Sequence, residues 1–339
     1  MGTDRFLIVR LGALGDVVHA IPVAAALRRA FPSARIDWLV SAKHREILDL
    51  VPVIDRRLVL EDFFSDVREL RNTRYDVAID LQGLLKSALV ARGSGAPRVI
   101  GFAAPYARER FASLFYTESY DPGRGGLYHP RETRHVVEIN LGMLEQLGVP
   151  LAPPEFPIEP VDSMAVRRAR EEAGGRFALL NPGAAWPNKR WPPERFAAVA
   201  AHLFERYGLK SVALWGPGEE QLAQQVVAGA NGAAVLSPTT TIADIAGLTR
   251  EAVLMVSGDT GPTHIAAAQG TPLVGIYGPT RPVRNGPMSP RDLTVSRDTI
   301  CQCHHLRRCR IDRMCLLDID AAEVIAAVDR RLAEASARG

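Results

Sequence analysis

The stretch LMVSGDTGPTHIAAAQGTPLVGIYGPT, residues 254–280, is the part of the chain that decides the fold. An apolar strand ends at Ser257-Gly258, a polar turn Asp259-Thr260-Gly261 follows, and a helix begins near Pro262. Proline is favoured in the first turn of a helix, and Ser, Thr and Asp are favoured just before it. A second apolar strand covers 272–277. The pattern predicts a strand–helix–strand unit whose helix N-terminus can bind phosphate, and it fits an ordinary, well-capped unit equally well.

Strand and helix patterns alternate in the same way along the rest of the chain. Such alternation predicts parallel sheets with helices on both faces. Apolar strand patterns cover 6–9, 36–40, 57–60, 77–81, 98–101, 177–181, 211–215 and 235–236. Helical patterns cover 17–30, 44–49, 63–71, 84–92, 135–147, 164–173, 193–207, 218–229, 242–250 and 321–335.

A proline-rich segment, VPLAPPEFPIEPV at 149–161, separates the two halves. Proline fixes φ and removes a hydrogen-bond donor, so this segment is typical of a stiff, extended connector. We therefore predict an N-terminal α/β domain over 1–150, a linker over 151–161, a C-terminal α/β domain over 162–318, and a final helix over 319–339.

The composition is that of a globular protein of about two domains. The chain has 339 residues, of which 47% are hydrophobic, and a net charge of +3, which gives no reason to expect a nucleic-acid partner. No apolar run approaches the roughly 18–20 residues that span a bilayer, and the apolar stretch near the N-terminus is too short for a signal peptide. We expect a cytoplasmic protein without a transmembrane segment.

The first strand runs directly into RLGALGD at 10–16. Gly12 and Gly15 permit a tight turn, but the spacing GxxGD differs from the dinucleotide-binding pattern GxGxxG. Asp16 stands at the start of a helix, where aspartate is a common cap. Because it also follows a strand end, where ligands bind in α/β sheets, Asp16 is equally a candidate general base.

Two further loops follow strands in the second half. The loop NPGAAWPNKRWP at 181–192 carries Lys189 and Arg190, which could hold a diphosphate or simply be solvated. The turn WGPGEE at 215–220 has glycines that let a sugar approach the backbone. Its Glu219 or Glu220 could bind ribose hydroxyls, although acidic residues also favour the first turn of any helix.

The chain resembles the bacterial lipopolysaccharide heptosyltransferases of glycosyltransferase family 9. The resemblance covers essentially the whole chain and lies in FLIVRLGALGDVVHAIP at the start, NPGAAWPNKRWP and ALWGPGEE in the second half, and VSGDTGPTHIAAAQGTPLVGIYGPT near the end. It implies a GT-B fold, in which two Rossmann-like doubly wound domains face each other across a cleft.

The resemblance also implies an inverting transfer from ADP-L-glycero-D-manno-heptose that needs no metal. Asp16 matches the position of the base, and Lys189 matches a group that stabilises the departing diphosphate. The residues that match donor-binding positions are Gly15, Asn181, Gly183, Lys189, Gly216, Glu219, Asp259, Thr260, Gly261 and His264.

Two N-terminal stretches, 78–93 and 107–116, look like the heptosyltransferase I branch. The branch implies an acceptor in the Kdo region of lipid A at the membrane surface. Lys86 and Arg108 then match acceptor-binding cations, or are ordinary surface cations. We expect a peripheral protein on the cytoplasmic face of the inner membrane. Heptosyltransferase II, another family 9 transferase using a different nucleotide-sugar, and a non-catalytic sugar-nucleotide-binding protein on this scaffold stay open as alternatives.

Four cysteines, Cys301, Cys303, Cys309 and Cys315, lie close together near the C-terminus. Their density in a cytosolic chain suggests a structural zinc or iron held by four thiolates. Reduced thiols in a loop are the alternative. The neighbouring arginines at 307, 308, 310 and 313 also fit a basic face toward anionic lipid.

Overall fold

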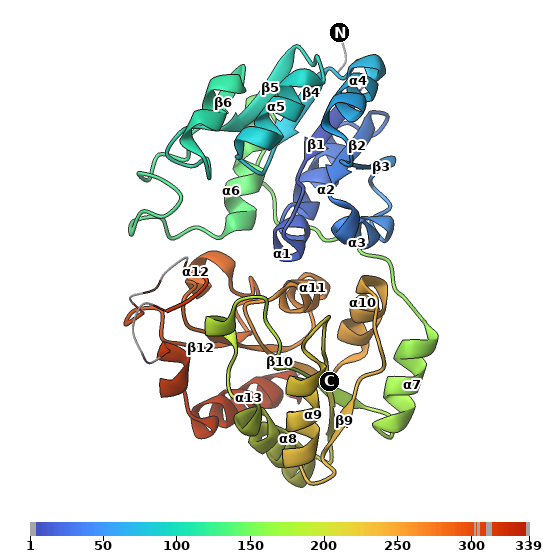
Figure 1. Ribbon diagram of the computed structural model, residues 1–339, viewed down its shortest axis with the longest axis vertical. Coiled ribbons are helices and arrows are strands. Elements are labelled where there is room, and N and C mark those ends of the chain that lie inside the picture. Colours follow the sequence, from blue (N-terminus) through green and yellow to red (C-terminus); the bar gives the residue numbers. More distant parts are fainter. Residues whose placement is uncertain (1–4, 302, 304–305, 310–313, 337–339) are drawn as a thin grey trace. The chain divides into compact units, whose positions relative to one another are not determined.

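The structure is a computed structural model that describes residues 5–301, 303, 306–309 and 314–336. The chain divides into two compact units, Met1–Glu159 and Pro160–Gly339. In the described part of the chain, each unit holds one parallel sheet of six strands (Figure 1). The predicted fold class, two doubly wound α/β domains, is therefore confirmed.

Unit 1 contains the first sheet, whose strand order is β3-β2-β1-β4-β5-β6. Its strands are β1 (Arg5–Val9), β2 (Arg35–Val40), β3 (Arg56–Val59), β4 (Val77–Asp80), β5 (Arg98–Phe102) and β6 (Glu118–Tyr120). Its helices are α1 (Leu14–Val18), α2 (Ile21–Ala30), η1 (Ala42–His44), α3 (Arg45–Asp49), α4 (Phe63–Thr73), α5 (Leu85–Gly93), η2 (Arg110–Phe115), α6 (Val136–Gly142) and η3 (Met143–Leu147).

Side chains of β1 alternate between the two faces of the unit 1 sheet, as expected for a strand. Leu7 faces the cluster that contains Leu70 of α4 and Val90 of α5. Phe6, the preceding residue, packs on Phe31 at the end of α2 with ring centroids 5.0 Å apart. Both faces of the sheet are thus covered, which explains why the strand is a continuous apolar run.

Unit 2 contains the second sheet, whose strand order is β12-β11-β10-β7-β8-β9. Its strands are β7 (Phe177–Asn181), β8 (Lys210–Ala213), β9 (Ala234–Leu236), β10 (Leu254–Gly258), β11 (Leu273–Tyr277) and β12 (Leu293–Ser296). Its helices are α7 (Met164–Glu172), η4 (Pro187–Lys189), α8 (Pro193–Tyr207), α9 (Glu220–Gly229), α10 (Ile242–Glu251), α11 (Gly261–Gln269), α12 (Pro282–Asn285), η5 (Cys315–Asp318) and α13 (Ala321–Ser336).

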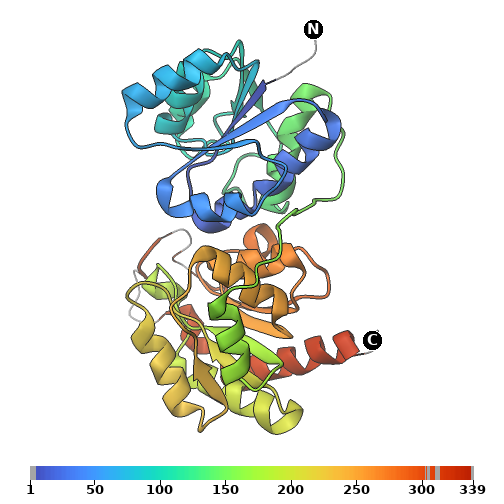
Figure 2. The same cartoon turned by 90° about the vertical axis from the view of Figure 1, so that its right-hand side faces the viewer.

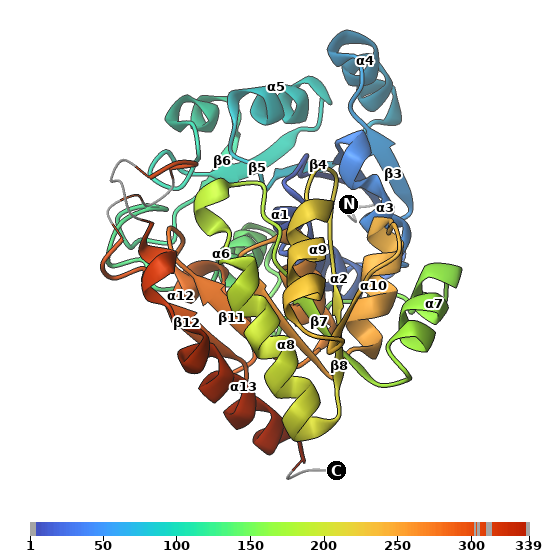
Figure 3. The same cartoon turned by 60° about the horizontal axis from the view of Figure 1, so that its bottom comes forward.

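Helices cover both faces of the unit 2 sheet (Figures 2 and 3). On one face α8, α9 and α13 pack on a cluster that includes Leu180 and Val256. On the other face α7, α10 and α11 pack on a cluster that includes Leu179 and Met255. Neighbouring residues of β7 and β10 therefore belong to opposite cores, so both strands are buried on each side.

The structure differs from the sequence prediction at the helix expected over 17–30. Two helices, α1 and α2, occupy this region and are separated at His19-Ala20. Pro22 explains the break, because its ring has no N–H and clashes with the carbonyl four residues earlier. The short elements β6, β12 and α12 were not predicted, since each has too few residues to show a period.

Candidate active site

The residues predicted to bind the donor gather at one point of the unit 2 sheet. Strand order reverses between β7 and β10, which pair in parallel through Ser257 and Asn181. Ligands of open α/β sheets bind at such a reversal, beyond the carboxyl ends of the strands. The loop after β7 carries Lys189, and the turn after β10 carries Asp259. Both loops therefore start at the place where this fold binds ligands.

Asp259 is the centre of a buried charged cluster. Lys189 Nζ lies 2.6 Å from Asp259 Oδ2, and His264 Nε2 lies 3.0 Å from Asp259 Oδ1. Only 5% of the Asp259 side chain is exposed. Burial alone would raise the pKa of Asp259, but hydrogen bonding to His264 and the charge of Lys189 hold it well below its usual range. Lys189 also lies over the ring of Trp186, 4.4 Å from its centroid.

A network of hydroxyl groups fixes the turn between β10 and α11. Asn181 Nδ2 donates to Ser257 Oγ at 3.1 Å and to Thr260 Oγ1 at 2.9 Å. Thr263 Oγ1 donates to the Gly258 carbonyl at 2.6 Å. Thr260 is the N-cap residue of α11, but its side chain makes no capping hydrogen bond. Pro262 has no N–H, so the N–H groups of Gly261 and Thr263 are the ones that this turn can offer to an anion.

Glu219 brings the remaining predicted donor residues together. Its carboxylate lies directly against Gly183 and Gly216, at positions that a Cβ atom on either glycine would approach or occupy. Arg190 Nη2 is 3.8 Å from Glu219 Oε1, and Arg190 Nε donates to the Ala184 carbonyl at 2.8 Å. The glycines thus leave room for a carboxylate beside the backbone, which suits recognition of ribose hydroxyls.

Asp16 lies at the strand-order reversal of unit 1, in the first turn of α1, the helix that follows β1. Arg10 Nη2 lies 2.9 Å from Asp16 Oδ1, and Arg108 Nη2 lies 2.7 Å from Asp16 Oδ2. The backbone N–H of Ala13, the N-cap of α1, also donates to Asp16. Asp16 therefore helps to cap its helix and at the same time forms a charged cluster.

The two arginines determine the charge state of Asp16. Burial would raise the pKa of Asp16, but the charges of Arg10 and Arg108 hold it below its usual range. Burial lowers the pKa of Arg10 to about 10, so this guanidinium is still charged at neutral pH. The side chain of Asp16 is 17% exposed and that of Arg108 is 31% exposed. A ligand can thus reach the cluster from the Arg108 side.

Sequence reasoning missed Arg10 and Asp80, two buried groups of this centre. Asp80 accepts hydrogen bonds from the N–H of Gln82 at 2.8 Å and from Tyr116 Oη at 2.8 Å, which fixes the loop after β4. The sequence signal that could have identified Arg10 and Asp80 is their position at the ends of predicted strands. Arg10 follows β1 directly, and Asp80 is the last residue of β4.

Two other predicted residues, Gly15 and Lys86, belong to unit 1. Gly15 is buried in the first turn of α1 in unit 1, whereas the other predicted donor residues belong to unit 2. Lys86 is exposed on α5, whereas Asp16 forms its ion pairs with Arg10 and Arg108.

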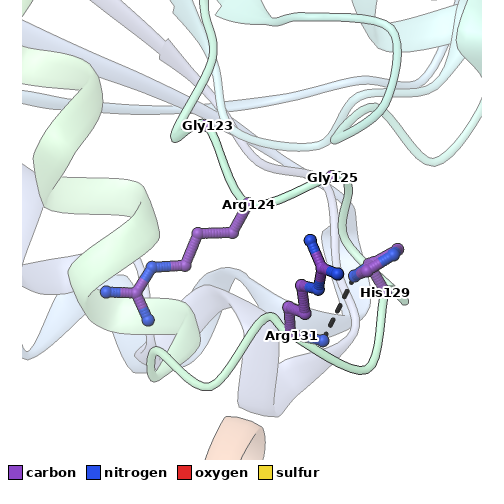
Figure 4. Close-up of a pocket in the computed structure, with 5 residues that line it drawn as sticks. All are labelled: Gly123, Arg124, Gly125, His129 and Arg131. Carbon is purple, nitrogen blue, oxygen red and sulfur yellow. Dashed lines mark hydrogen bonds between the residues drawn. The ribbon is translucent and has the colours of Figure 1, made fainter.

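A basic pocket of unit 1 lies beside the segment that carries Arg108. Figure 4 shows Arg124, His129 and Arg131 around a cavity of about 410 Å³. A second cavity, of about 280 Å³, shares His129 with the first and is also lined by Arg108 and Arg110. Arg108 thus belongs both to the cluster of Asp16 and to a cavity that Arg110 and His129 also line, and this cavity could bind an anionic acceptor.

The four cysteines are free and form one partly buried cluster. In the described part of the chain, however, no three His, Cys, Asp or Glu side chains are arranged to hold a metal ion. The predicted zinc or iron site therefore receives no support from the geometry. Residues 302, 304–305 and 310–313, which include two histidines and two of the arginines considered above, lie outside the described residues.

Within the described residues, none of the helices combines the length and the apolar character that crossing a bilayer requires.

Comparison with known proteins places these features in a family. The model of glycosyltransferase family 9 (heptosyltransferase) matches residues 64–314. Lipopolysaccharide heptosyltransferase 1 of Pseudomonas aeruginosa is 31% identical over 88% of this chain and 85% of its own length. A lipopolysaccharide heptosyltransferase 3 of Escherichia coli is 27% identical over 94% of this chain and 96% of its own length.

Solved structures agree with the fold. The family 9 glycosyl transferase of Veillonella parvula has a TM-score of 0.80 and 25% identity, and covers 98% of this chain and 99% of its own. Escherichia coli heptosyltransferase WaaC with ADP-2-deoxy-2-fluoro heptose has a TM-score of 0.73 and 23% identity, and covers 96% and 99%. Because the family model matches more than half of this chain, and a relative 31% identical covers 88% of it, the chain belongs to glycosyltransferase family 9 and is a glycosyltransferase.

Proposed function

We propose that the chain transfers L-glycero-D-manno-heptose from ADP-heptose to the Kdo region of lipid A, as a heptosyltransferase I on the cytoplasmic face of the inner membrane. The observation that carries the proposal is the Lys189–Asp259–His264 cluster beside the uncapped start of α11. The name of the Pseudomonas aeruginosa relative and the ligand of the Escherichia coli structure support it.

The donor site uses charge in two ways. The diphosphate binds at the N–H groups that begin α11 and near the Lys189 ammonium, so charge that develops on the departing ADP is stabilised where it forms. Asp259 sets the position of Lys189 and His264 and offers an acceptor to sugar hydroxyls. Glu219 binds the ribose beside Gly183 and Gly216. No step of this scheme requires a metal.

Asp16 serves as the general base for the acceptor hydroxyl. In inverting glycosyl transfer, a carboxylate activates the nucleophile on the face opposite to the leaving group. The pKa of Asp16 is low while both arginines hold it, which keeps it ionised but weakly basic. Binding of an acceptor carboxylate or phosphate to Arg108 draws this cation from Asp16. The loss of one cation raises the pKa of Asp16 and strengthens it as a base.

A second candidate function differs from heptosyltransferase I only in the acceptor molecule. The similarity to a relative named lipopolysaccharide heptosyltransferase 3 favours a heptosyltransferase that acts at another step than heptosyltransferase I, on a core that already carries heptose in our proposal. A transferase of the heptosyltransferase II kind would do the same, and a family 9 enzyme with another nucleotide-sugar would differ in its donor.

The test is a turnover assay with ADP-heptose and two acceptors, Kdo₂-lipid A with and without a first heptose. We expect transfer to the acceptor without heptose. Transfer only to the heptosylated acceptor contradicts assignment as heptosyltransferase I. If neither acceptor is used with ADP-heptose, while another nucleotide-sugar supports transfer, the donor assignment fails as well.

A further inference from the structure

Two neighbouring elements of unit 1 expose large apolar side chains. On η2, Phe111 is 70% exposed and Leu114 is 76% exposed. They are three residues apart, so they project from the same side of a 3₁₀-helix. On α5, Leu85 and Leu89 are 36% and 41% exposed and are four residues apart, which places them on one side of an α-helix.

These two elements form one continuous surface. The helices α5 and η2 pack against each other (Figures 1 and 3). The residue before η2, Glu109, donates its N–H to the Gly83 carbonyl at 2.9 Å. Its carboxylate accepts from the N–H of Leu85 at 2.6 Å. We call the four apolar side chains Leu85, Leu89, Phe111 and Leu114 the docking surface.

Exposed cations border the docking surface. Lys86 and Arg92 lie on α5, and Arg110 begins η2. None of the three takes part in an ion pair with another residue that the structure describes. Exposed arginines elsewhere do form such pairs, for example Arg168 with Glu172 and Arg56 with Glu69. With three cations against the single carboxylate of Glu109, the charge around the docking surface is net positive.

We propose that the docking surface binds the chain to an anionic lipid bilayer. Phe111 and Leu114 enter the boundary between headgroups and acyl chains, while the bordering cations contact lipid phosphates. The combination of apolar side chains with unpaired cations selects this partner, because a neutral protein face would leave the charges without partners. The inference rests on the proposed function in one respect, since a lipid-linked acceptor gives the enzyme a reason to bind a bilayer.

The second cavity of unit 1, of about 280 Å³, connects the docking surface to the Asp16 cluster through shared residues. Arg110 borders the docking surface and also lines the cavity that it shares with Arg108 and His129. Arg108 in turn contacts Asp16. Docking through η2 therefore brings the base of unit 1 close to the membrane surface, where a lipid-linked acceptor presents its sugar.

The experiment measures sedimentation of the full chain with phosphatidylcholine vesicles and with vesicles that also contain phosphatidylglycerol. We expect strong binding only to the anionic vesicles. Phe111→Ser combined with Leu114→Ser weakens this binding roughly tenfold or more, because two exposed apolar groups no longer leave water. Arg92→Gln combined with Arg110→Gln also weakens it roughly tenfold or more, since each charge near an anionic surface contributes roughly fivefold.

Matched control variants change the same residue types in unit 2. Met164→Ser combined with Phe204→Ser removes exposed apolar side chains from α7 and α8. Arg250→Gln combined with Arg330→Gln removes two exposed charges. Both control variants should bind vesicles as the unaltered chain does. Equal loss of binding in the controls, or no loss in the docking-surface variants, overturns the inference.

Two further measurements separate the alternatives. If light scattering shows a dimer that dissociates in the Phe111→Ser, Leu114→Ser variant while vesicle binding persists, the surface is an interface between copies of the chain, and the inference is wrong. Transfer to a water-soluble acceptor fragment should be unchanged in this variant. Absence of transfer in the unaltered chain with intact vesicle binding would overturn the proposed function but leave docking in place.

Discussion

Asp16 in unit 1 and Asp259 in unit 2 are buried carboxylates that occupy similar surroundings in the two units. Each carboxylate follows a central strand of a sheet with the same strand order. Asp16 is held by two arginines, and Asp259 by a lysine and a histidine. In both, burial would raise the carboxylate pKa and the neighbouring cations lower it instead.

The two sites differ in how firmly the cations are held. Asp259 is 5% exposed, and the ammonium of its partner Lys189 is kept in place by the ring of Trp186. Asp16 is 17% exposed, and its partner Arg108 is 31% exposed on a loop segment. One cluster is closed and suits a fixed electrostatic role. The Asp16 cluster is more open, so Arg108 can leave Asp16 for another anion. Such an exchange suits a carboxylate that must accept a proton from a substrate.

The largest expected effect comes from Asp16→Asn. The amide oxygen can accept from only one of the two arginines, and the amide cannot take up the acceptor proton, so kcat should fall by roughly 10²–10⁴-fold. Affinity for ADP, measured by calorimetry, should stay unchanged. Asp62→Asn, a change at the exposed N-cap of α4, is the matched control. An unchanged kcat in Asp16→Asn would mean that Asp16 is not the base.

Lys189→Ala breaks the closed cluster of unit 2. Affinity for ADP should weaken roughly ten- to a hundredfold, because hydrogen bonds between charged groups contribute about 1.5–3 kcal/mol. Isothermal titration calorimetry with ADP measures this effect. Lys210→Ala, on β8 of the same unit, is the control and should bind ADP normally. Equal affinity in both variants would exclude Lys189 from diphosphate binding.

Arg108→Gln tests whether the unit 1 cluster exchanges a partner. Arg108 lowers the pKa of Asp16, so its removal should raise that pKa by about one unit or more. The acid limb of the pH profile of kcat/KM then moves to higher pH. Arg45→Gln, which removes the exposed partner of Asp49 on α3, should leave the profile in place. A profile that does not move in Arg108→Gln contradicts the exchange of partners.

The smallest effect is on stability in acid. The pKa of Asp259 is lower in the folded chain than in the unfolded chain, where it is about 3.9. Its contribution is fully present above that value and is lost as the pH falls toward the folded pKa. The melting temperature of the unaltered chain should therefore decline more steeply below about pH 4 than that of Asp259→Asn. Parallel curves in scanning calorimetry would show that the cluster does not stabilise the fold through this charge.

Much of the fold follows from local sequence. Pro192 and Pro193 begin α8 and Gly208, in the left-handed conformation, ends it, so its predicted bounds agree with the structure. The loops that carry Lys189 and Asp259 could be found because strand ends are the places where this fold binds ligands.

Other features depend on contacts that are distant in the sequence. Arg108 meets Asp16 across 92 positions, and no local pattern encodes that meeting. Arg10 was missed because a basic residue at a strand end is unremarkable until its burial is known. The helix expected over 17–30 was wrong because Pro22 overrides a continuous apolar period.

Gly83 joins the loop of Arg108 to the first turn of α5. Its φ of +70° suits glycine, and a Cβ atom there would lie 3.1 Å from the backbone nitrogen of Arg108. Two hydrogen bonds of Glu109 tie the same segments together. Any side chain at position 83 would therefore press against the backbone of Arg108, the residue whose guanidinium contacts Asp16. The absence of a side chain at Gly83 is thus a condition for the position of the Asp16 cluster.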